Sequence, residues 1–140
     1  MVLGWYRMAR ASDTEKITIN LGPIDLGQID LLVQEGFYSN RTDFIRTAIR
    51  NQLAQHAEEL RRSVARKTLV LGVQHFTRQD LEAVRAAEQK LQINVLGLAT
   101  IAEDVPAELA LATIESIAVL GALRASPAVR AALGPRIVSP

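Results

Sequence analysis

The first clear pattern along the chain is a strict alternation of apolar and polar residues in EKITINL, residues 15–21. This period of two is typical of a strand with one buried face. Gly22-Pro23 then breaks the strand, and apolar positions spaced by three and four predict an amphipathic helix over about residues 24–35. The apolar face of the expected strand consists of Ile17, Ile19 and Leu21, and its polar face consists of Lys16, Thr18 and Asn20.

A longer amphipathic pattern follows the next turn. Ser39 or Asn40 can cap its N-terminus, and Asp43 lies near the positive end of the helix dipole. Apolar residues continue at steps of three and four, which predicts one long helix that runs to about residue 66. Its second half is charged and thinly apolar, so we interpret residues 55–67 as a helical connector that is either paired with another helix or solvated.

From Thr68 the composition shifts to Ala, Val, Leu and Ile, and a weak internal repeat follows. The tripeptide Val-Leu-Gly recurs there with its glycines at positions 72, 97 and 121. Each repeat would be a buried strand followed by a helix, for instance strand 68–76 and helix 77–90, which implies parallel strands with right-handed crossovers. The repeat could also be a chance match in an apolar segment.

Local signals set the ends of the later helices. Asp104 begins a plausible helical turn, whereas Ser126 starts a last short helix that Gly134 ends, so the third repeat is truncated. So small a sheet leaves open edges that invite another copy of the chain. We therefore interpret residues 68–140 as an oligomerisation domain.

Composition and charge exclude several classes of protein. The 140 residues are 49% hydrophobic and 22% charged with a net charge of +1, which fits one or two small globular domains. Without cysteine there can be no disulfide scaffold, thiolate metal site or thiol nucleophile. The apolar runs are too short to span a bilayer, and Arg7 and Arg10 interrupt the apolar opening before a secretory-type core can form. We expect a mobile arm over residues 1–14 and a cytoplasmic protein.

Candidate catalytic and metal-binding residues are few. His56 and His75 have no third ligand at a recognisable metal spacing, and acidic pairs such as Glu58-Glu59 do not converge on one point of a helix face. The Val-Leu-Gly glycines lack the lysine that follows in a phosphate-binding loop. We therefore expect no enzyme, no cofactor and no metal.

The expected N-terminal strand cannot bury its apolar face alone, because one short strand and two short helices make too small a core. Two copies paired antiparallel would form a two-stranded ribbon over four helices, with the polar faces of both strands outward. The ammonium, hydroxyl and carboxamide groups of that face can hydrogen-bond to base edges, and a two-stranded ribbon fits the major groove of DNA.

In this region the sequence resembles the ribbon-helix-helix DNA-binding family, the MetJ, Arc and CopG type of repressor. The resemblance covers about residues 15–53 and is carried by IDLLVQEGFYSNRTDFIRTAIRNQL, with its Gly-Phe-Tyr-Ser turn and its Phe-Ile-Arg and Ala-Ile-Arg motifs. Together with the C-terminal pattern it predicts an α+β fold class. An intertwined ribbon-helix-helix dimer with a long second helix would precede a small domain of β-α repeats with parallel strands.

The resemblance also implies roles for individual positions. The base-reading positions are Lys16, Thr18 and Asn20. Backbone amides at the start of the second helix hold a DNA phosphate, as helix N-termini do in general, and these belong to Ser39, Asn40 and Arg41. Further candidates for DNA backbone or arm contacts are Arg7, Arg10 and Arg46, with Arg50 a weaker one. The dimer core would contain Ile17, Ile19, Leu21, Phe44, Ile45 and Ile49.

Our leading hypothesis is a transcriptional repressor whose dimers read double-stranded DNA and whose C-terminal domains link dimers into tetramers or larger assemblies. One alternative is an antitoxin-like autoregulator or protein-binding module that engages another protein through the C-terminal half. That half is apolar, however, whereas antitoxins of this family usually carry a charged, disordered tail. Another alternative is a structural protein that polymerises through the repeat strands. A nickel-responsive regulator is disfavoured because its metal site needs a cysteine.

Overall fold

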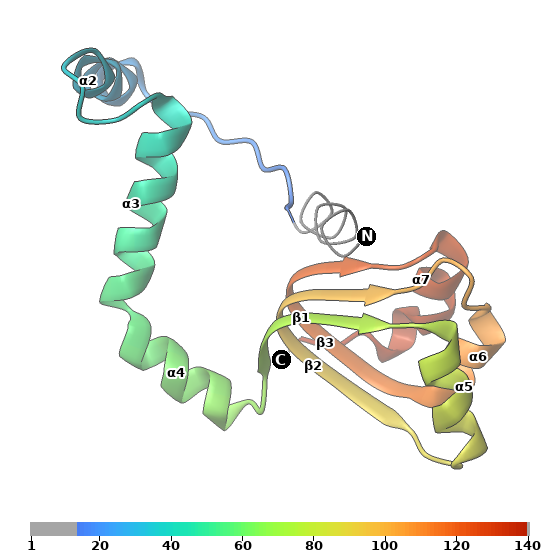
Figure 1. The fold of residues 1–140 in the computed structure, drawn as a ribbon. Coiled ribbons are helices and arrows are strands. Elements are labelled where there is room, and N and C mark those ends of the chain that lie inside the picture. The colour runs from blue at the N-terminus through green and yellow to red at the C-terminus, as the bar shows by residue number, and fades with distance from the viewer. Residues whose placement is uncertain (1–13, 140) are drawn as a thin grey trace, which may run out of the picture. The chain divides into compact units, whose positions relative to one another are not determined.

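A computed structural model describes residues 14–139 of the chain (Figure 1). Contacts divide these residues into two compact units, one over Thr14–Arg62 and the other from Ser63 onward. We call them the N-terminal unit and the C-terminal unit and describe each by itself. Six helices and one three-stranded parallel sheet make this a mixed fold, as the sequence predicts.

The N-terminal unit contains two helices joined by a short turn. α2 spans Pro23–Gln34 and α3 spans Arg41–Gln55. Pro23 suits the first turn of α2, because its ring fixes φ and its missing N–H would have no acceptor there. Gly36 adopts a φ of +86° in the turn that follows, a conformation that glycine reaches without steric cost. The first helix is thus confirmed within one residue of its expected ends.

Residues 14–22 are extended and belong to no helix or strand of the described chain (Figure 1). The strand expected over residues 15–21 is therefore absent from the single chain. A strand needs a hydrogen-bonded neighbour, and the expected neighbour is the same segment of a second copy. The antiparallel ribbon accordingly remains a prediction.

The prediction of one long second helix is wrong, because the helix is divided at His56. α3 ends at Gln55 and α4 spans Ala57–Arg66. The ψ of His56 is +14°, and its N–H donates to the carbonyl of Leu53 in a tighter turn at 3.1 Å. Neither helix contains a buried residue, so no packing holds the two segments in line.

Strands and helices alternate along the C-terminal unit, and the strands form one parallel sheet in the order β1-β2-β3. The strands are β1 Val70–Phe76, β2 Leu91–Ile101 and β3 Ile114–Arg124. The helices are α5 Arg78–Ala86, α6 Ala107–Thr113 and α7 Pro127–Leu133, and the 3-10 turn η1 covers Gly134–Arg136. The parallel sheet predicted for this half is therefore observed.

Two predicted elements are shorter than expected. The strand expected over 68–76 begins two residues late, because Thr68 adopts a left-handed φ of +51° that an extended strand does not allow. The helix expected over 77–90 ends at Ala86, because Glu88 adopts a φ of +54°. A left-handed residue commonly ends a helix in this way.

The two later helices differ in how well their starts are predicted. α6 starts after Pro106 rather than at the expected Asp104, so that prediction is wrong by one turn. The last helix starts as expected, with the hydroxyl of Ser126 accepting the N–H of Val129 at 3.2 Å. It ends at the expected Gly134, where the short η1 turn begins.

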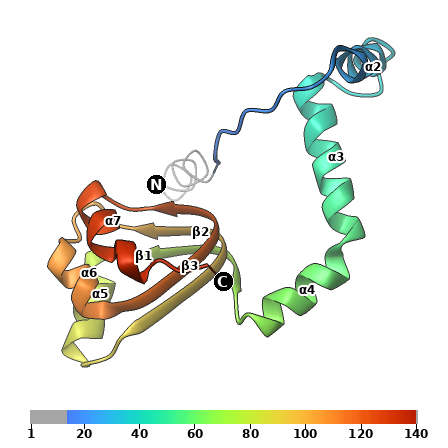
Figure 2. The same cartoon turned by 180° about the vertical axis from the view of Figure 1, so that it is seen from behind.

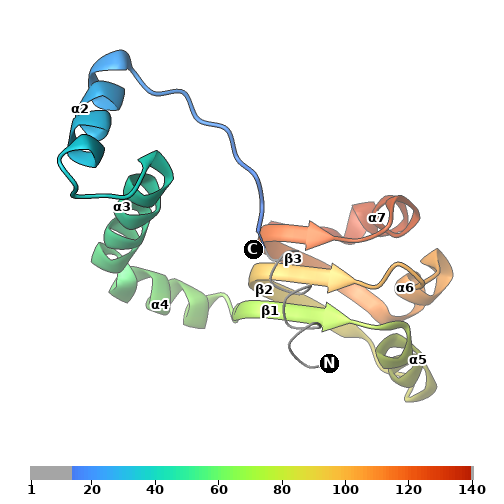
Figure 3. The ribbon, with the colours of Figure 1, turned by 45° about the horizontal axis from the view of Figure 1, so that its top comes forward.

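The three Val-Leu-Gly tripeptides stand directly side by side in the sheet. Gly72 pairs with Gly97, and Gly97 pairs with Gly121. All three have φ between +117° and +141°, a range that side chains rarely adopt. A Cβ on Gly97 would lie 2.1 Å from the carbonyl oxygen of Gly72, and a Cβ on Gly121 would lie equally close to that of Gly97. Figures 1 and 3 show β2 and β3 doubling back along their length, and this row of glycines permits the bend.

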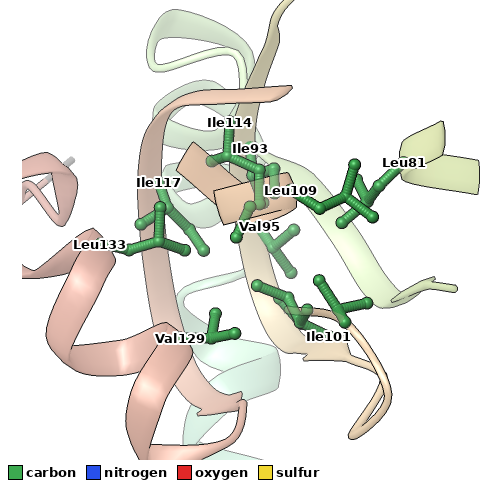
Figure 4. Close-up of a cluster of buried hydrophobic side chains, with 12 residues drawn as sticks. Leu81, Ile93, Val95, Ile101, Leu109, Ile114, Ile117, Val129 and Leu133 are labelled. Atoms are coloured by element: carbon green, nitrogen blue, oxygen red, sulfur yellow. The ribbon is translucent and has the colours of Figure 1, made fainter. Parts of the chain in front are cut away.

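The core of the C-terminal unit lies between the inner face of the bent sheet and the three helices (Figure 4). Leu81 of α5, Leu109 of α6 and Leu133 of α7 are almost fully buried against β2 and β3. Thr113 is the one buried polar side chain of the described residues, and its hydroxyl donates to the carbonyl of Leu109 at 2.7 Å. The unit therefore has a complete core of its own.

The C-terminal segment runs along the outer edge of β3 (Figure 2). Ile137 forms a parallel bridge with Ile117, and the N–H of Val138 donates to the carbonyl of Ile117 at 2.9 Å. This edge of the sheet is thus partly paired, whereas β1 forms the opposite edge. Among residues 14–139, no helix is both long and apolar enough to cross a lipid bilayer.

Candidate nucleic-acid interface

The segment before α2 exposes both of its faces in the single chain. The polar side chains Lys16, Thr18 and Asn20 are accessible, as base-reading groups would have to be. The alternating apolar side chains are accessible as well, with Ile17 74%, Ile19 53% and Leu21 42% exposed. Three accessible apolar side chains in one short segment are typical of a surface that another chain covers.

An apolar groove lies next to this segment. It has a volume of about 350 Å³ and is lined by apolar side chains of α2 and α3, by Leu21 and by two polar residues of α2. The ring of Phe44 packs edge-on against that of Tyr38, with 5.0 Å between ring centroids. The lining residues are Leu21, Asp25, Gln28, Ile29, Leu32 and Phe44.

The residues expected in a dimer core are poorly covered. Phe44 and Ile45 are half-buried and Ile49 is exposed, while Ile29 is the one buried apolar residue of the described N-terminal unit. A folded domain does not normally leave so much of its apolar surface in water. The helices of this unit therefore lack a core that the described chain itself completes.

Reciprocal hydrogen bonds fix the start of α3. The side chain of Asn40 accepts the N–H of Asp43 at 2.8 Å, and the carboxylate of Asp43 accepts the N–H of Ser39 at 2.9 Å. Asn40 is therefore the cap, and of the two candidates named from the sequence Ser39 is not. The N–H of Asp43 is thus taken by Asn40, whereas the N–H groups of Arg41 and Thr42 have no carbonyl partner within the helix and can meet an anion.

The side chain of Arg41 is held by Asp30 of α2. Its Nε and one terminal nitrogen donate to the two carboxylate oxygens at 2.7 and 2.8 Å. The hydrogen bond from Arg41 holds the pKa of Asp30 below its ordinary value, and the same pair raises the pKa of Arg41. The guanidinium therefore ties α2 to α3, and only the backbone of Arg41 is left for a phosphate.

A shallow pocket at the start of α3 collects most of the predicted phosphate-binding residues. Its volume is about 340 Å³. Thr42, Arg46 and Arg50 stand four residues apart, so they share one face of the helix, and this spacing could have added Thr42 to the candidates Arg46 and Arg50 named from the sequence. The lining residues are Ser39, Asn40, Thr42, Asp43, Arg46 and Arg50.

The N-terminal unit has basic residues at the start of α3 but no overall excess of positive charge. Residues 14–62 contain six Lys or Arg and seven Asp or Glu, so the unit has no general positive field. The two arginines of the pocket outnumber its one carboxylate, that of Asp43. Arg7 and Arg10, the expected arm contacts, lie outside the described residues.

Comparison with known proteins extends the resemblance found in the sequence. The model of one family, described as the Ribbon-Helix-Helix transcriptional regulator family, matches residues 12–130. The chain belongs to the ribbon-helix-helix transcriptional regulator family. Members of this family bind DNA, usually act as dimers and are typically not enzymes. No curated protein and no solved structure matches the chain.

The extent of the family match corrects one expectation. The resemblance in the sequence covers residues 15–53, whereas the family model reaches residue 130 and so includes the residues of all three strands. The chain is accordingly a DNA-binding transcriptional regulator, and the family match takes in most of its C-terminal unit.

Proposed function

We propose that this protein is a sequence-specific repressor whose N-terminal units pair into a ribbon that reads the major groove. The observation that carries the proposal is the alternation in residues 15–21, where exposed apolar and exposed polar side chains take turns beside an uncovered apolar groove. Antiparallel pairing of two copies would bury the apolar set in both grooves. The polar set of both copies would then face outward together.

The polar face supports direct reading of bases. Lys16 offers three N–H donors, Thr18 a hydroxyl, and Asn20 both a donor and an acceptor. An asparagine can pair with adenine through two hydrogen bonds, and lysine favours the acceptors of guanine. Sequence preference is therefore assigned to these three positions.

The start of α3 supports positioning on the DNA backbone. Thr42, Arg46 and Arg50 line the shallow pocket at the start of α3, where a phosphate oxygen would meet side-chain donors close to the helix N-terminus. Asp43, whose carboxylate accepts the N–H of Ser39, lies in the same pocket and opposes an anion there. These contacts orient the dimer, and they carry no sequence information.

The C-terminal unit supports a linking role. It has its own core, so it can fold without adding to the ribbon, and every ribbon dimer would carry two such units. Linked dimers that occupy neighbouring sites gain affinity through high effective concentration without any new DNA contact. Repression then follows from stable occupation of the operator.

The proposal is tested by titrating full-length protein into the DNA upstream of its own gene, across a salt series. We expect wild type to prefer that DNA over random sequence. The double variant Lys16→Ala/Asn20→Ala should lose about 10²-fold of this preference, because each good base contact contributes about 1–3 kcal/mol of discrimination. Weaker, salt-dependent binding to any DNA should remain.

Two further variants separate base reading from charge. Arg46→Ala/Arg50→Ala should weaken binding evenly across sequences and reduce the salt dependence, as loss of phosphate contacts does. Lys90→Ala removes one exposed cation from the C-terminal unit and serves as the matched control. If wild type shows no preference for any sequence, or if Lys90→Ala abolishes the preference as fully as the ribbon variant does, the proposal is wrong.

A further inference from the structure

The sheet of the C-terminal unit has a second apolar surface that its helices do not use. In parallel strands, residues in register share a face, and neighbouring residues along one strand point to opposite faces. Residues such as Val95 and Ile101 point into the core, so the alternate positions point outward. We call this second surface the outer face. Its apolar members, two rows in register, are Leu71, Leu96 and Leu120, then Val73, Leu98 and Ala122.

Much of the outer face is accessible. On the two outer strands Leu71 is 73% exposed, Val73 47% and Leu120 44%, and none of them packs against the core beneath the helices, whereas Leu98 on the middle strand is only 5% exposed. Parallel sheets are normally covered on both faces, because their strands are apolar on both. An uncovered apolar face on such a sheet therefore indicates a partner.

The chemistry of the outer face indicates what kind of partner it is. The two central rows contain no charged or polar side chain, so the face does not match a nucleic acid or a charged peptide. The flanking row at one end holds His75, Thr100 and Arg124, and the row at the other end holds Asn94. With two copies stacked face to face in opposite directions, leucine rows meet leucine rows. Arg124 of each copy then lies near the end of the other copy's face that holds Asn94, so the two cations stay apart.

We propose that the outer face is the contact by which C-terminal units of different ribbon dimers pair, so that two dimers form a tetramer. The proposal rests on the proposed function, since the ribbon supplies the dimers that the face then joins. It differs from pairing through the open edge of β1, which would extend the sheet by backbone hydrogen bonds. A face contact depends only on alternate residues of each strand, those whose side chains point to the outer face.

Two neighbouring residues of β1 can therefore be used as a test variant and its matched control. Leu71→Lys places a charge on the outer face, whereas Val70→Lys places it at the neighbouring residue, which points to the other face and is 46% exposed. Sedimentation of the full-length proteins should show a tetramer for wild type and for Val70→Lys, and a dimer for Leu71→Lys. Affinity for DNA with two adjacent sites should fall by about 10²-fold for Leu71→Lys, with single-site binding unchanged.

The absence of cysteine allows a second, independent measurement. Leu96 lies on the middle strand, in the row with Leu71 and Leu120. Leu96→Cys should therefore form a disulfide between copies under mild oxidation. Val138→Cys, exposed in the C-terminal segment away from the two rows, is the control and should not. This readout does not depend on how well a charged variant folds.

Several outcomes would overturn the inference. Wild type that stays a dimer at all concentrations would mean that no second copy covers the face. Equal loss of tetramer for Val70→Lys and Leu71→Lys would assign association to the edge of β1 instead. A further result would be a wild-type tetramer that Leu71→Lys reduces to a dimer and that nevertheless fails to bind DNA. That result would overturn the proposed function but not the pairing through the outer face.

Discussion

The two units of this protein solve the problem of burying apolar surface in opposite ways. The C-terminal unit encloses a cluster that includes Leu81, Leu109 and Leu133, with strands on one side and helices on the other. The N-terminal unit buries Ile29 alone and leaves Ile17 and neighbouring residues in water. The C-terminal unit encloses a core within the single chain, whereas the N-terminal unit does not, and in the proposed ribbon dimer a second copy would supply the missing contacts.

This difference assigns the stability of each unit to a different source. The free energy of unfolding of the C-terminal unit comes from contacts within one chain, so it should not require association. The free energy of unfolding of the N-terminal unit includes association, so it should rise with protein concentration. The proposed ribbon dimer would thereby couple folding of its DNA-reading surface to association.

The largest effect should come from breaking the core of the self-sufficient unit at its glycine row. Gly97→Ala places a Cβ 2.1 Å from the carbonyl oxygen of Gly72, which is backbone and cannot move aside, and does so at a φ of +141°. We expect the C-terminal unit to unfold or to lose well over the roughly 1–3 kcal/mol that strained backbone alone costs. Thermal unfolding followed by circular dichroism measures this loss.

Gly72→Ala is the matched control for that variant. Gly72 has a similar φ of +134°, but nothing lies within 4 Å of the position of its Cβ. It should therefore show the backbone strain without the collision. Equal destabilisation by the two variants would mean that the close approach of the strands contributes nothing.

A smaller effect should distinguish the incomplete unit. Ile17→Ala would cost little if Ile17 stayed as accessible as it is in the single chain, since exposed substitutions usually change stability by about 0.5 kcal/mol or less. If a second copy buries it, we expect a loss of about 2–4 kcal/mol, comparable to Leu109→Ala in the C-terminal core. Urea unfolding at two protein concentrations gives both values.

The dependence of stability on protein concentration should differ between Ile17→Ala and Leu109→Ala. Measured in the Leu71→Lys background, which removes pairing of the outer face, the loss from Leu109→Ala should not depend on concentration, whereas unfolding of the N-terminal unit should. Ile24→Ala, at an equally exposed isoleucine on α2, is the control and should have little effect. A loss for Ile17→Ala no larger than that for Ile24→Ala would contradict the ribbon dimer.

The smallest effect concerns pH. The hydrogen bond from Arg41 lowers the pKa of Asp30 in the N-terminal unit, and that from the N–H of Thr77 lowers the pKa of Asp80 in the C-terminal unit. Because both pKa values lie below the unfolded value of about 3.9, both carboxylates stabilise the protein above that pH. The stabilisation is lost as the pH falls through the lower pKa of the folded state.

Salt should separate the two carboxylates. The pair of Asp30 and Arg41 joins two exposed charges, so salt should weaken it, while the bonds of Asp80 to a backbone N–H should resist. Unfolding of Asp30→Asn and Asp80→Asn at neutral and acid pH, with and without salt, tests this. An identical salt response for the two variants would contradict the assignment.

The sequence predicts elements best where a local signal decides them. Gly22-Pro23 and the apolar spacing that follows locate the first helix, and Ser126 locates the last one, because caps and turns depend on neighbours in the chain. The parallel sheet follows from repeated Val-Leu-Gly, and pairing of those tripeptides in register explains why the repeat was visible.

Features that depend on distant residues or on packing could not be predicted. The ion pair of Arg41 with Asp30 joins two helices, and nothing in the sequence around Arg41 indicates it. The sequence predicts only a phosphate contact at the start of the helix. The helix is divided at His56, where no buried side chain holds α3 and α4 in line. The spacing of apolar residues does not show whether those residues are packed. Whether residues 15–21 form a strand depends on a second chain, which a single sequence leaves open.

The glycine row also makes the two edges of the sheet unequal. Each glycine leaves room for the carbonyl of the strand before it, and at Gly72 that room is empty because no strand precedes β1 in the sheet. The opposite edge is partly taken by the bridge of Ile137 with Ile117. An added strand would therefore fit more readily beside β1 than beside β3, so the sheet has a direction in which it can grow.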